Sequence, residues 1–562
     1  MKNLLKKDIP AWVYYLLGVI FIGGKLALAA CQTVYIWTEG APLDDGFMYN
    51  AAVSITQGNW LGAYNWLTLS KHAFFAVWLA FLHLLGIPYL IGGQLLWAGA
   101  CATAVAAFSP VIAKRWQRFV MFAVLLFSPA ATAAFTLRVY RDNIFPALCV
   151  IVFAGFIGTA LRLDKPLKKS LGFLIGGGFA LGAAYLSRED GVWVLPFVLA
   201  ATAITVIFII FKKGLLHKVR RALCLAVPYV LAVGCILVYC GINNAYYGRF
   251  IVSDFTSTEF NDVIGAMARV EQTDWNPKAS IPYETRRQLY DNVPEFAMFE
   301  ELLESKAVRN GYYSSAVGDY SSGAFYWALR RVAQELGVYD TPQKAQEYWA
   351  NLAQQINAAC DNGTIKAGKF TSSTMPPLRS EYILPVTQEA FHSLRYTLTF
   401  QDTLCYYPND LSVGKPKDIK EWETFLKETS NIAAVENSAD VYYHPLWLKA
   451  YALMNAIRWL YIVGVPLGFL AAFVLQCRRG WQLLRAKQQH RPTQGFLLWL
   501  VLLGILLMAL LRCFIVAYVT VASFTIGTYV MYLSTVHPLL LLYMLAGLMG
   551  RSPAPDFLPA KE

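Results

Sequence analysis

Residues 73–87, AFFAVWLAFLHLLGI, determine the topology of this chain. They are apolar apart from His83, but a helix needs about 20 residues to cross a bilayer core about 30 Å thick. Longer apolar segments lie on both sides of them, at 11–34, 89–112, 119–137, 143–161, 170–187, 191–211, 222–243, 450–476, 495–520 and 527–549. The sequence therefore predicts an all-α polytopic membrane protein with about ten transmembrane helices.

The distribution of basic residues indicates whether 73–87 crosses. If it does not, 22 Lys and Arg fall on the side of the two termini, and the opposite loops between spans hold only Lys71, Arg138, Arg141 and Arg188. If it does cross, the basic loops lie outside. Because cytoplasmic loops carry the excess of Lys and Arg, we expect 73–87 to lie along the membrane or re-enter it, with both termini inside.

Composition divides the chain into two parts. Only 15% of its 562 residues are charged and 57% are hydrophobic, whereas soluble proteins carry about 25% charged residues, so an ordinary soluble enzyme is excluded. Residues 243–449 have a net charge of −7, and the rest of the chain has +19. The total of +12 thus reflects membrane topology and indicates no nucleic-acid partner.

We expect three regions. Residues 1–243 form a membrane module with a long first external loop at 35–88, residues 244–449 an external soluble domain, and residues 450–562 the C-terminal membrane helices. Within the soluble domain, helices are predicted over 324–336 and over 343–360, the latter capped by Thr341-Pro342. Residues 366–420 have a loop-like composition. Whether Cys360 and Cys405 form a disulfide is left open by the sequence.

Ionisable residues on the outer face near the membrane fall in four places. Such groups are costly at membrane depth, so they are functional candidates by default. The four places are Asp44-Asp45 after the first span, Lys71-His72, the group Arg138, Arg141 and Asp142, and Arg188-Glu189-Asp190. Arg512 and Arg458 add charges in later spans, where pairing with external acids would steady the helix bundle.

These residue types suit the transfer of a group from a lipid phosphate. A carboxylate such as Asp44 or Asp45 can accept the proton of an acceptor hydroxyl. Arg and Lys can hold a phosphate and stabilise its growing charge. The sequence has no P-loop or strand-linked Gly-rich fingerprint, so an activated donor would be lipid-borne. Competing interpretations are an N-cap role for the acidic pair, snorkelling of the arginines, and local ion pairs.

Several motifs resemble those of the GT-C superfamily of integral-membrane glycosyltransferases. They are DDGFMYNAA at 44–52, GNWLG at 58–62, KHAFF at 71–75 and RVYRD at 138–142. The seven spans before residue 244 match the seven-helix module of that family. Two departures are the Asp-Asp pair, where many members have Asp-Glu, Glu-Asp or Asp-x-Asp, and Ala73-Phe74, where a Pro is usual after Lys/His.

The resemblance implies inverting transfer of a sugar from a polyprenyl phosphate to a cell-envelope glycan or lipid, on the outer face of a bacterial cytoplasmic membrane. Asp44 would be the base, with Asp45 its nearest rival. The donor phosphate would be bound by Lys71, Arg138, Arg141 and Arg188. The acceptor or its partners would be oriented by His72, Asp142, Glu189 and Asp190. No cofactor is expected, and without an Asp-x-Asp motif a divalent metal is not favoured.

Two other function classes remain open from the sequence. A lipid or envelope-precursor flippase would place charges and broken helices near mid-membrane and often has internal repeats. A non-catalytic envelope scaffold would use residues 244–449 to bind a partner.

Overall fold

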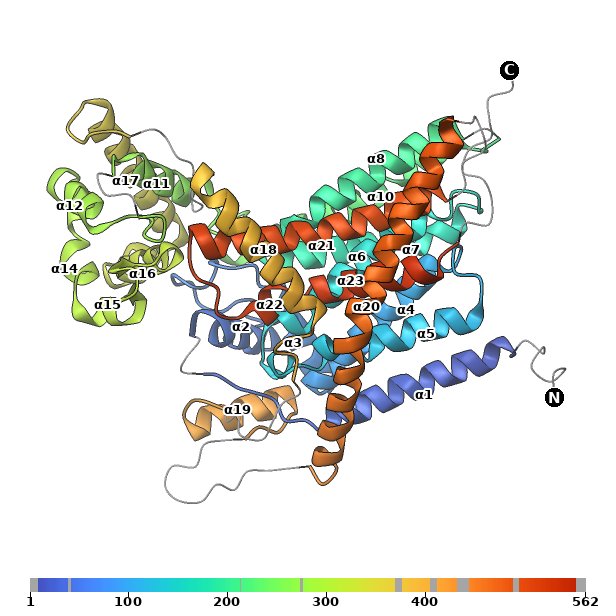
Figure 1. The fold of residues 1–562 in the computed structure, drawn as a ribbon. Coiled ribbons are helices and arrows are strands. Elements are labelled where there is room, and N and C mark those ends of the chain that lie inside the picture. Colours follow the sequence, from blue (N-terminus) through green and yellow to red (C-terminus); the bar gives the residue numbers. More distant parts are fainter. Residues whose placement is uncertain are drawn as a thin grey trace.

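The computed structural model describes residues 9–38, 42–212, 214–272, 276–368, 377–404, 412–431, 444–488 and 495–551. These residues are mainly helical (Figure 1). Within them, the only strands are the short antiparallel pair β1 (Tyr313–Ser314) and β2 (Asp319–Tyr320). The prediction of an all-α polytopic protein is confirmed.

Eight of the ten expected spans are helical segments long and apolar enough to cross a membrane. Five of these segments each consist of one continuous helix: α1 (Ala11–Ala30), α4 (Tyr89–Phe108), α7 (Lys168–Ser187), α20 (Trp447–Gln488) and α21 (Phe496–Ala522). The other three are composite: Arg141–Ala160 contains α6 (Phe145–Ala160), Glu189–Phe211 contains α8 (Leu195–Phe211), and Lys218–Tyr247 contains α9 (Lys218–Cys224) and α10 (Val227–Tyr247).

The two remaining expected spans form shorter helices. In 119–137, α5 (Arg115–Leu126) ends before Pro129 and is followed by 3₁₀ turns at Pro129–Ala131 and Ala134–Leu137. Proline lacks an N–H and disfavours helical backbone in the residue before it. In 527–549, the chain forms α22 (Tyr529–Tyr532) and then α23 (Val536–Met549), which has Pro538 in its first turn.

The segment 73–87 forms a short helix within the loop predicted at 35–88. Helix α3 (Phe74–Leu85) has 12 residues, about 18 Å of length, which falls short of a bilayer core of about 30 Å. It packs against α2 (Phe47–Thr56). A π-helical turn, Pro42–Gly46, precedes α2 and carries the acidic pair.

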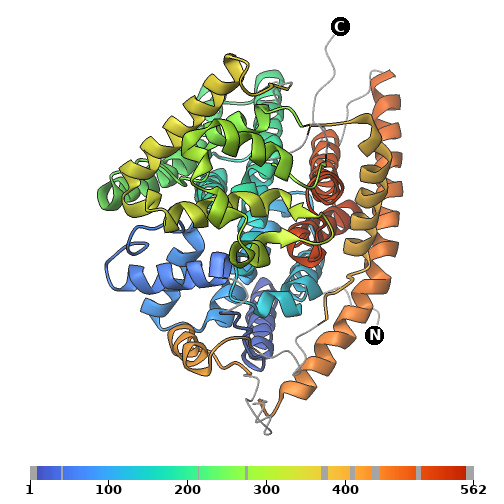
Figure 2. The same cartoon turned by 90° about the vertical axis from the view of Figure 1, so that its left-hand side faces the viewer.

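Residues 258–365 form a separate helical lobe, drawn in green and olive in Figures 1 and 2. It has its own hydrophobic core, which includes Phe260, Leu329 and Trp349. Its longest helices, α16 (Ser322–Glu335) and α17 (Pro342–Asp361), confirm the predicted helices. The shorter ones are α11 (Thr258–Arg269), α12 (Tyr283–Asn292), α13 (Pro294–Ala297), α14 (Glu300–Leu303) and α15 (Lys306–Tyr312).

The expected loop-like character of 366–420 is wrong for part of that range. Helix α18 (Ile383–Leu398) lies along α21, and α19 (Pro416–Leu426) begins within the range and lies beside α3 (Figure 1). The Tyr529 hydroxyl donates to Glu389 of α18, so tertiary contacts stabilise this helix. Cys405 lies outside the described residues, so the structure does not test whether it forms a disulfide with Cys360.

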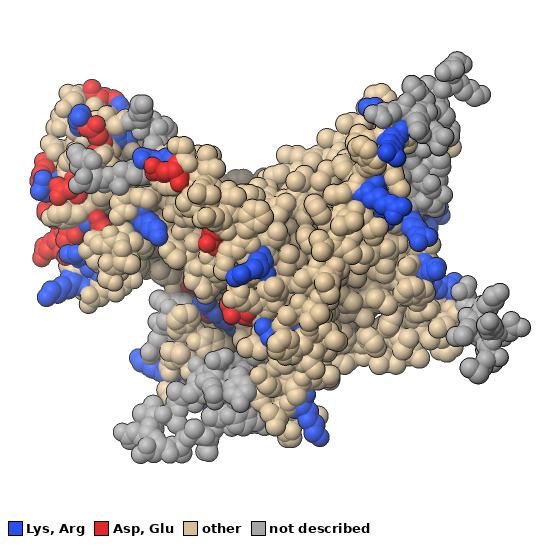
Figure 3. All heavy atoms as spheres, in the orientation of Figure 1, with Lys and Arg blue, Asp and Glu red and all other residues tan. Residues whose placement is uncertain are grey.

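Charge is segregated on the molecular surface. Figure 3 shows Asp and Glu gathered on the lobe of α11–α17, whereas the opposite end of the membrane helices displays Lys and Arg. The predicted topology, in which the lobe is external and the basic end is inside, stays a prediction.

The membrane helices approach closely at small residues. Helix α6 packs along α7, and α7 along α10. A Cβ atom on Gly155 would lie 2.8 Å from the Cα of Gly177 and 2.8 Å from the carbonyl oxygen of Phe173. Such small-residue contacts let membrane helices pack backbone to backbone.

We therefore expect Gly155→Ala to lower the free energy of unfolding by about 1–3 kcal/mol, because the helices must separate to admit the methyl group. Gly176→Ala is the matched control, since nothing lies within 4 Å of its added Cβ. Thermal unfolding in detergent, followed by tryptophan fluorescence, measures both. Equal melting temperatures for the two variants would contradict this packing.

Candidate functional site

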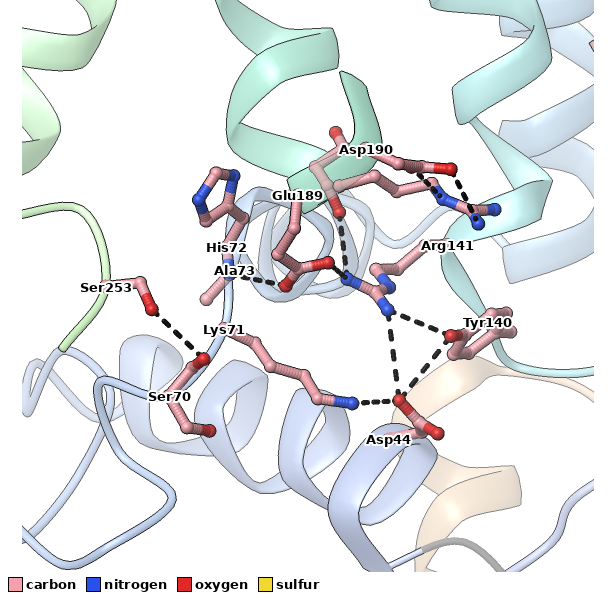
Figure 4. Close-up of polar contacts among 12 residues, drawn as sticks. Asp44, Ser70, Lys71, His72, Ala73, Tyr140, Arg141, Glu189, Asp190 and Ser253 are labelled. Carbon is pink, nitrogen blue, oxygen red and sulfur yellow. Dashed lines mark hydrogen bonds and ion pairs between the residues drawn. The ribbon is translucent and has the colours of Figure 1, made fainter. Parts of the chain in front are cut away.

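Residues from all four groups of ionisable side chains that the sequence predicts at the outer face lie close together in the structure (Figure 4). The acidic pair lies in the π-helical turn Pro42–Gly46, and Lys71 and His72 lie in the first external loop. The other two groups lie in the short segments just before α6 and just before α8. Nine of the ten site residues predicted from the sequence form ion pairs here, in three neighbouring groups that together make up a charge cluster. The tenth, His72, contributes only its backbone N–H.

Asp44 lies at the centre of the accessible part of the cluster. Its carboxylate forms an ion pair with the Lys71 ammonium and lies 3.8 Å from Nη2 of Arg141. The Tyr140 hydroxyl donates to the same carboxylate oxygen over 3.5 Å. The Asp44 side chain is 35% exposed, whereas that of Lys71 is 10% exposed. A ligand can therefore reach the carboxylate at a point where two cations converge.

Asp45 has a different environment, although it is the next residue. Its side chain is fully buried and accepts two hydrogen bonds from Arg138, at 2.7 Å and 2.8 Å. The Arg138 guanidinium lies over the rings of Trp37 and Tyr140. This bidentate pair fixes Asp45 behind Asp44 and away from solvent.

Arg141 connects Asp44 to Glu189. Its Nη1 donates to Glu189 over 2.8 Å, and its Nη2 donates to the Tyr140 hydroxyl over 2.9 Å. His72 contributes its backbone, since its N–H donates to Glu189 over 3.2 Å. The imidazole lies away from the cluster, with Nδ1 2.6 Å from the carbonyl oxygen of Tyr185 (Figure 4).

A deeper set of pairs lies behind these contacts. Arg188 donates to both oxygens of Asp142, at 3.0 Å and 3.1 Å, and to Asp190 at 3.0 Å. Arg512 of α21 donates to Asp190 over 2.6 Å, so this arginine is paired with an acid. The Ser534 hydroxyl, just before α23, donates to Asp142 over 3.0 Å. Early and late parts of the chain therefore share this network.

The geometry decides among the competing interpretations of these residues. Helix α2 begins after Gly46 with no side-chain cap, so the acidic pair does not cap it. Arg141 and Arg188 are buried and paired with acids, so they do not snorkel to headgroups. Arg458, in contrast, donates to Phe400 and Thr403 and reaches no acid in the described contacts.

The two neighbouring aspartates differ in pKa. Burial raises the pKa of Asp45 to about 6, against the opposing effect of Arg138. Burial also acts on Asp44, but Lys71 and Arg141 favour its charged form and leave its pKa below the ordinary value. Burial lowers the pKa of the Lys71 ammonium, and Asp44 opposes only part of that change. Asp45 is therefore the carboxyl more ready to hold a proton near neutral pH.

The sequence did not single out three contributors to the site. Tyr140 lies inside the RVYRD motif at 138–142, so its position in the sequence points to the site. Ser534 and Trp327 are polar or aromatic residues without a local motif, and only the fold brings them to the cluster. In the part of the chain that the structure describes, no three His, Cys, Asp or Glu side chains are grouped to hold a metal ion.

The chain was compared with known proteins. No family model and no curated protein matches it. Among solved structures, it is similar to ArnT from Cupriavidus metallidurans in the apo state, with 13% identity, a TM-score of 0.30, and coverage of 96% of this chain and 78% of that one. For the same protein bound to undecaprenyl phosphate, the identity is 13%, the TM-score 0.31 and the coverage 96% and 79%. Likenesses at this level carry no argument about function.

The elevated pKa of Asp45 predicts proton uptake as the pH falls through about 6, where an ordinary Asp takes up a proton near 3.8. Because the folded state then binds a proton that the unfolded chain lacks, this group's contribution to the free energy of unfolding rises as pH falls through that window and is lost above it. Infrared difference spectra should show a carboxylic-acid carbonyl band with a midpoint near pH 6.

The band should be absent from Asp45→Asn and retained in Asp164→Asn, an exposed acid paired with Lys212. A band that persists in Asp45→Asn, or a wild-type midpoint near the ordinary value, would show that this assignment is wrong.

Proposed function

We propose that this protein is a membrane glycosyltransferase that moves a sugar from a polyprenyl-phosphate donor to a hydroxyl of a cell-envelope glycan or lipid. The observation that carries the proposal is the partly exposed Asp44 carboxylate held between Lys71 and Arg141 at the membrane edge. The resemblance of its motifs to those of GT-C enzymes supports the same function. A polyprenyl phosphate would also suit a site beside eight apolar helices.

The proposed location is the outer face of a bacterial cytoplasmic membrane, with both termini in the cytoplasm. In this proposal, residues 1–243 form the catalytic membrane module, 244–449 the external part and 450–562 the closing helices. Membrane lipids surround the spans, and the donor reaches the site from the bilayer.

Lys71 and Arg141 are the best candidates to bind the donor phosphate. Both already contact the accessible carboxylate of Asp44, so an incoming phosphate competes for the same two cations. Charge-assisted hydrogen bonds to phosphate are roughly twice as strong as neutral ones. Arg138 and Arg188 are each committed to buried acids, so they hold the site in shape and add positive potential.

Asp44 is the proposed base. It accepts the proton of the acceptor hydroxyl while that oxygen bonds to the anomeric carbon of the sugar. The bond between this carbon and the phosphate oxygen breaks, and its electron pair stays with the phosphate. Attack from the side opposite the leaving group inverts the anomeric centre. Lys71 and Arg141 stabilise the charge that grows on the departing phosphate.

The remaining acids have a positioning role in this proposal. Glu189 holds Arg141 and accepts from the backbone of His72. Asp142 and Asp190 flank Arg188. These pairs keep the cations at fixed places, so the acceptor and donor meet Asp44 in one geometry.

Asp44→Asn should lower the rate of transfer by about 10²–10⁴-fold, because the amide cannot accept the proton. Transfer of labelled sugar from polyprenyl phosphate to acceptor in proteoliposomes measures this rate. Lys71→Met should raise the KM for the donor and also lower kcat, because Lys71 is proposed both to bind the phosphate and to stabilise its growing charge.

Asp164→Asn serves as the control, since this exposed acid lies outside the charge cluster. Full transfer by an Asp44→Asn/Asp45→Asn double variant would exclude the proposed mechanism.

A further inference from the structure

One face of α16 contacts the first external loop. Trp327, Arg330 and Gln334 lie at positions i, i+3 and i+7 of this helix, so they project from the same side. All three reach loop residues 66–71. Helix α16 belongs to the lobe that follows α10 in sequence, whereas the loop follows α1.

Arg330 is the anchor of this contact. Its side chain is fully buried and donates to the carbonyl oxygen of Trp66 and, over 2.8 Å, to Asp254. Gln334 accepts from the backbone N–H of Trp66 over 3.1 Å. A buried guanidinium with both partners in place holds the backbone of the loop at a fixed distance from α16.

The chain just before the lobe binds the loop as well. The N–H of Asp254 donates to the carbonyl oxygen of Leu69 over 2.8 Å. The Ser253 hydroxyl donates to the carbonyl oxygen of Ser70 over 3.1 Å, and Figure 4 shows this contact next to Lys71. Hydrogen bonds therefore join the two residues that precede Lys71 to the residues just before the lobe.

Trp327 continues the contact to the Lys71 side chain itself. The Lys71 ammonium lies 5.0 Å from the centre of the Trp327 ring. The ring is in turn packed against Phe255 at 5.0 Å and Trp66 at 6.3 Å between centroids. An ammonium over an indole face is attracted by the ring electrons, so the Lys71 ammonium that pairs with Asp44 is also held by Trp327.

We propose that the lobe forms part of the candidate site, with Trp327 as a positioning residue that holds the Lys71 ammonium against Asp44 and shields it from water. The importance of Lys71 to a donor phosphate rests on the proposed function. The position of Lys71 does not, and it can be measured without any donor. A purely structural role of α16 would need Arg330 and Gln334 but would not need the indole ring.

The test is the rate at which a small amine-acetylating reagent modifies Lys71 in the full-length protein, measured by mass spectrometry. In the wild type, Lys71 should react slowly. Trp327→Ala should increase its rate several-fold, whereas Trp327→Phe, which retains a ring, should stay near the wild-type rate. Lys344 on α17, which is 54% exposed, is the internal reference and should react equally in all variants.

Arg331→Ala is the matched variant on the same helix, since Arg331 is 41% exposed and pairs with Glu335 within α16. It should leave the Lys71 rate unchanged. An altered Lys344 rate in Trp327→Ala would reveal misfolding, and Trp327→Phe then decides: wild-type reactivity of Lys71 supports the role of the ring, and fast reactivity overturns it. An unchanged Lys71 rate in a folded Trp327→Ala also overturns it.

A second readout separates this proposal from the proposed function. If the wild type transfers sugar, Trp327→Ala should raise the KM for the donor and lower kcat, because Lys71 in the proposed mechanism both binds the phosphate and stabilises its growing charge. Trp327→Phe should restore both constants. Wild-type values of KM and kcat in Trp327→Ala would overturn the positioning role. If the wild type transfers no sugar, the proposed function fails, and the reactivity of Lys71 still decides the role of Trp327.

Discussion

The cost of placing charge at the edge of a membrane governs this structure. Charged side chains removed from water must be paired, because an unpaired buried charge strongly destabilises the folded state. The cluster satisfies this constraint because its five basic side chains are balanced by five acidic ones. The basic ones are Lys71, Arg138, Arg141, Arg188 and Arg512, and the acidic ones are Asp44, Asp45, Asp142, Glu189 and Asp190. Since its members come from the first loop, the segments before α6 and α8, and α21, the same pairing also joins distant helices.

This balance has a chemical consequence. The proposed donor phosphate would add negative charge to a cluster that is already neutral, so an acid would have to give up its cation or take up a proton. Asp44 is the acid that can yield, because it is partly exposed and its partners face the same opening. Asp45, with a pKa of about 6, is the acid that can take up a proton. Asp44 is thus suited to act as a base and Asp45 to take up a proton, although the two residues are adjacent in sequence.

Sequence patterns predicted the long membrane helices and most members of the cluster. Long apolar runs predicted the eight long helical segments, and the ionisable residues expected on the outer face include nine that are paired in the structure, whereas the imidazole of His72 lies away from them. Pairing was beyond the sequence, since nothing local links Asp142 to Ser534 or Lys71 to Trp327. The helical form of residues 383–398 was also missed, because α21, far along the chain, covers it. The prediction of a span over 119–137 rested on the apolar composition of this segment and gave no weight to Pro129. In the structure, α5 ends before this proline.

The central claim is that this cluster is a site for a lipid phosphate. The most direct test compares the affinities of the wild-type protein in nanodiscs for a polyprenyl phosphate and for the corresponding polyprenol, by native mass spectrometry. The two lipids share their chain and differ only in the phosphate. The account predicts that the phosphate binds at least about tenfold more tightly, which is about 1.4 kcal/mol. Equal affinities would contradict it.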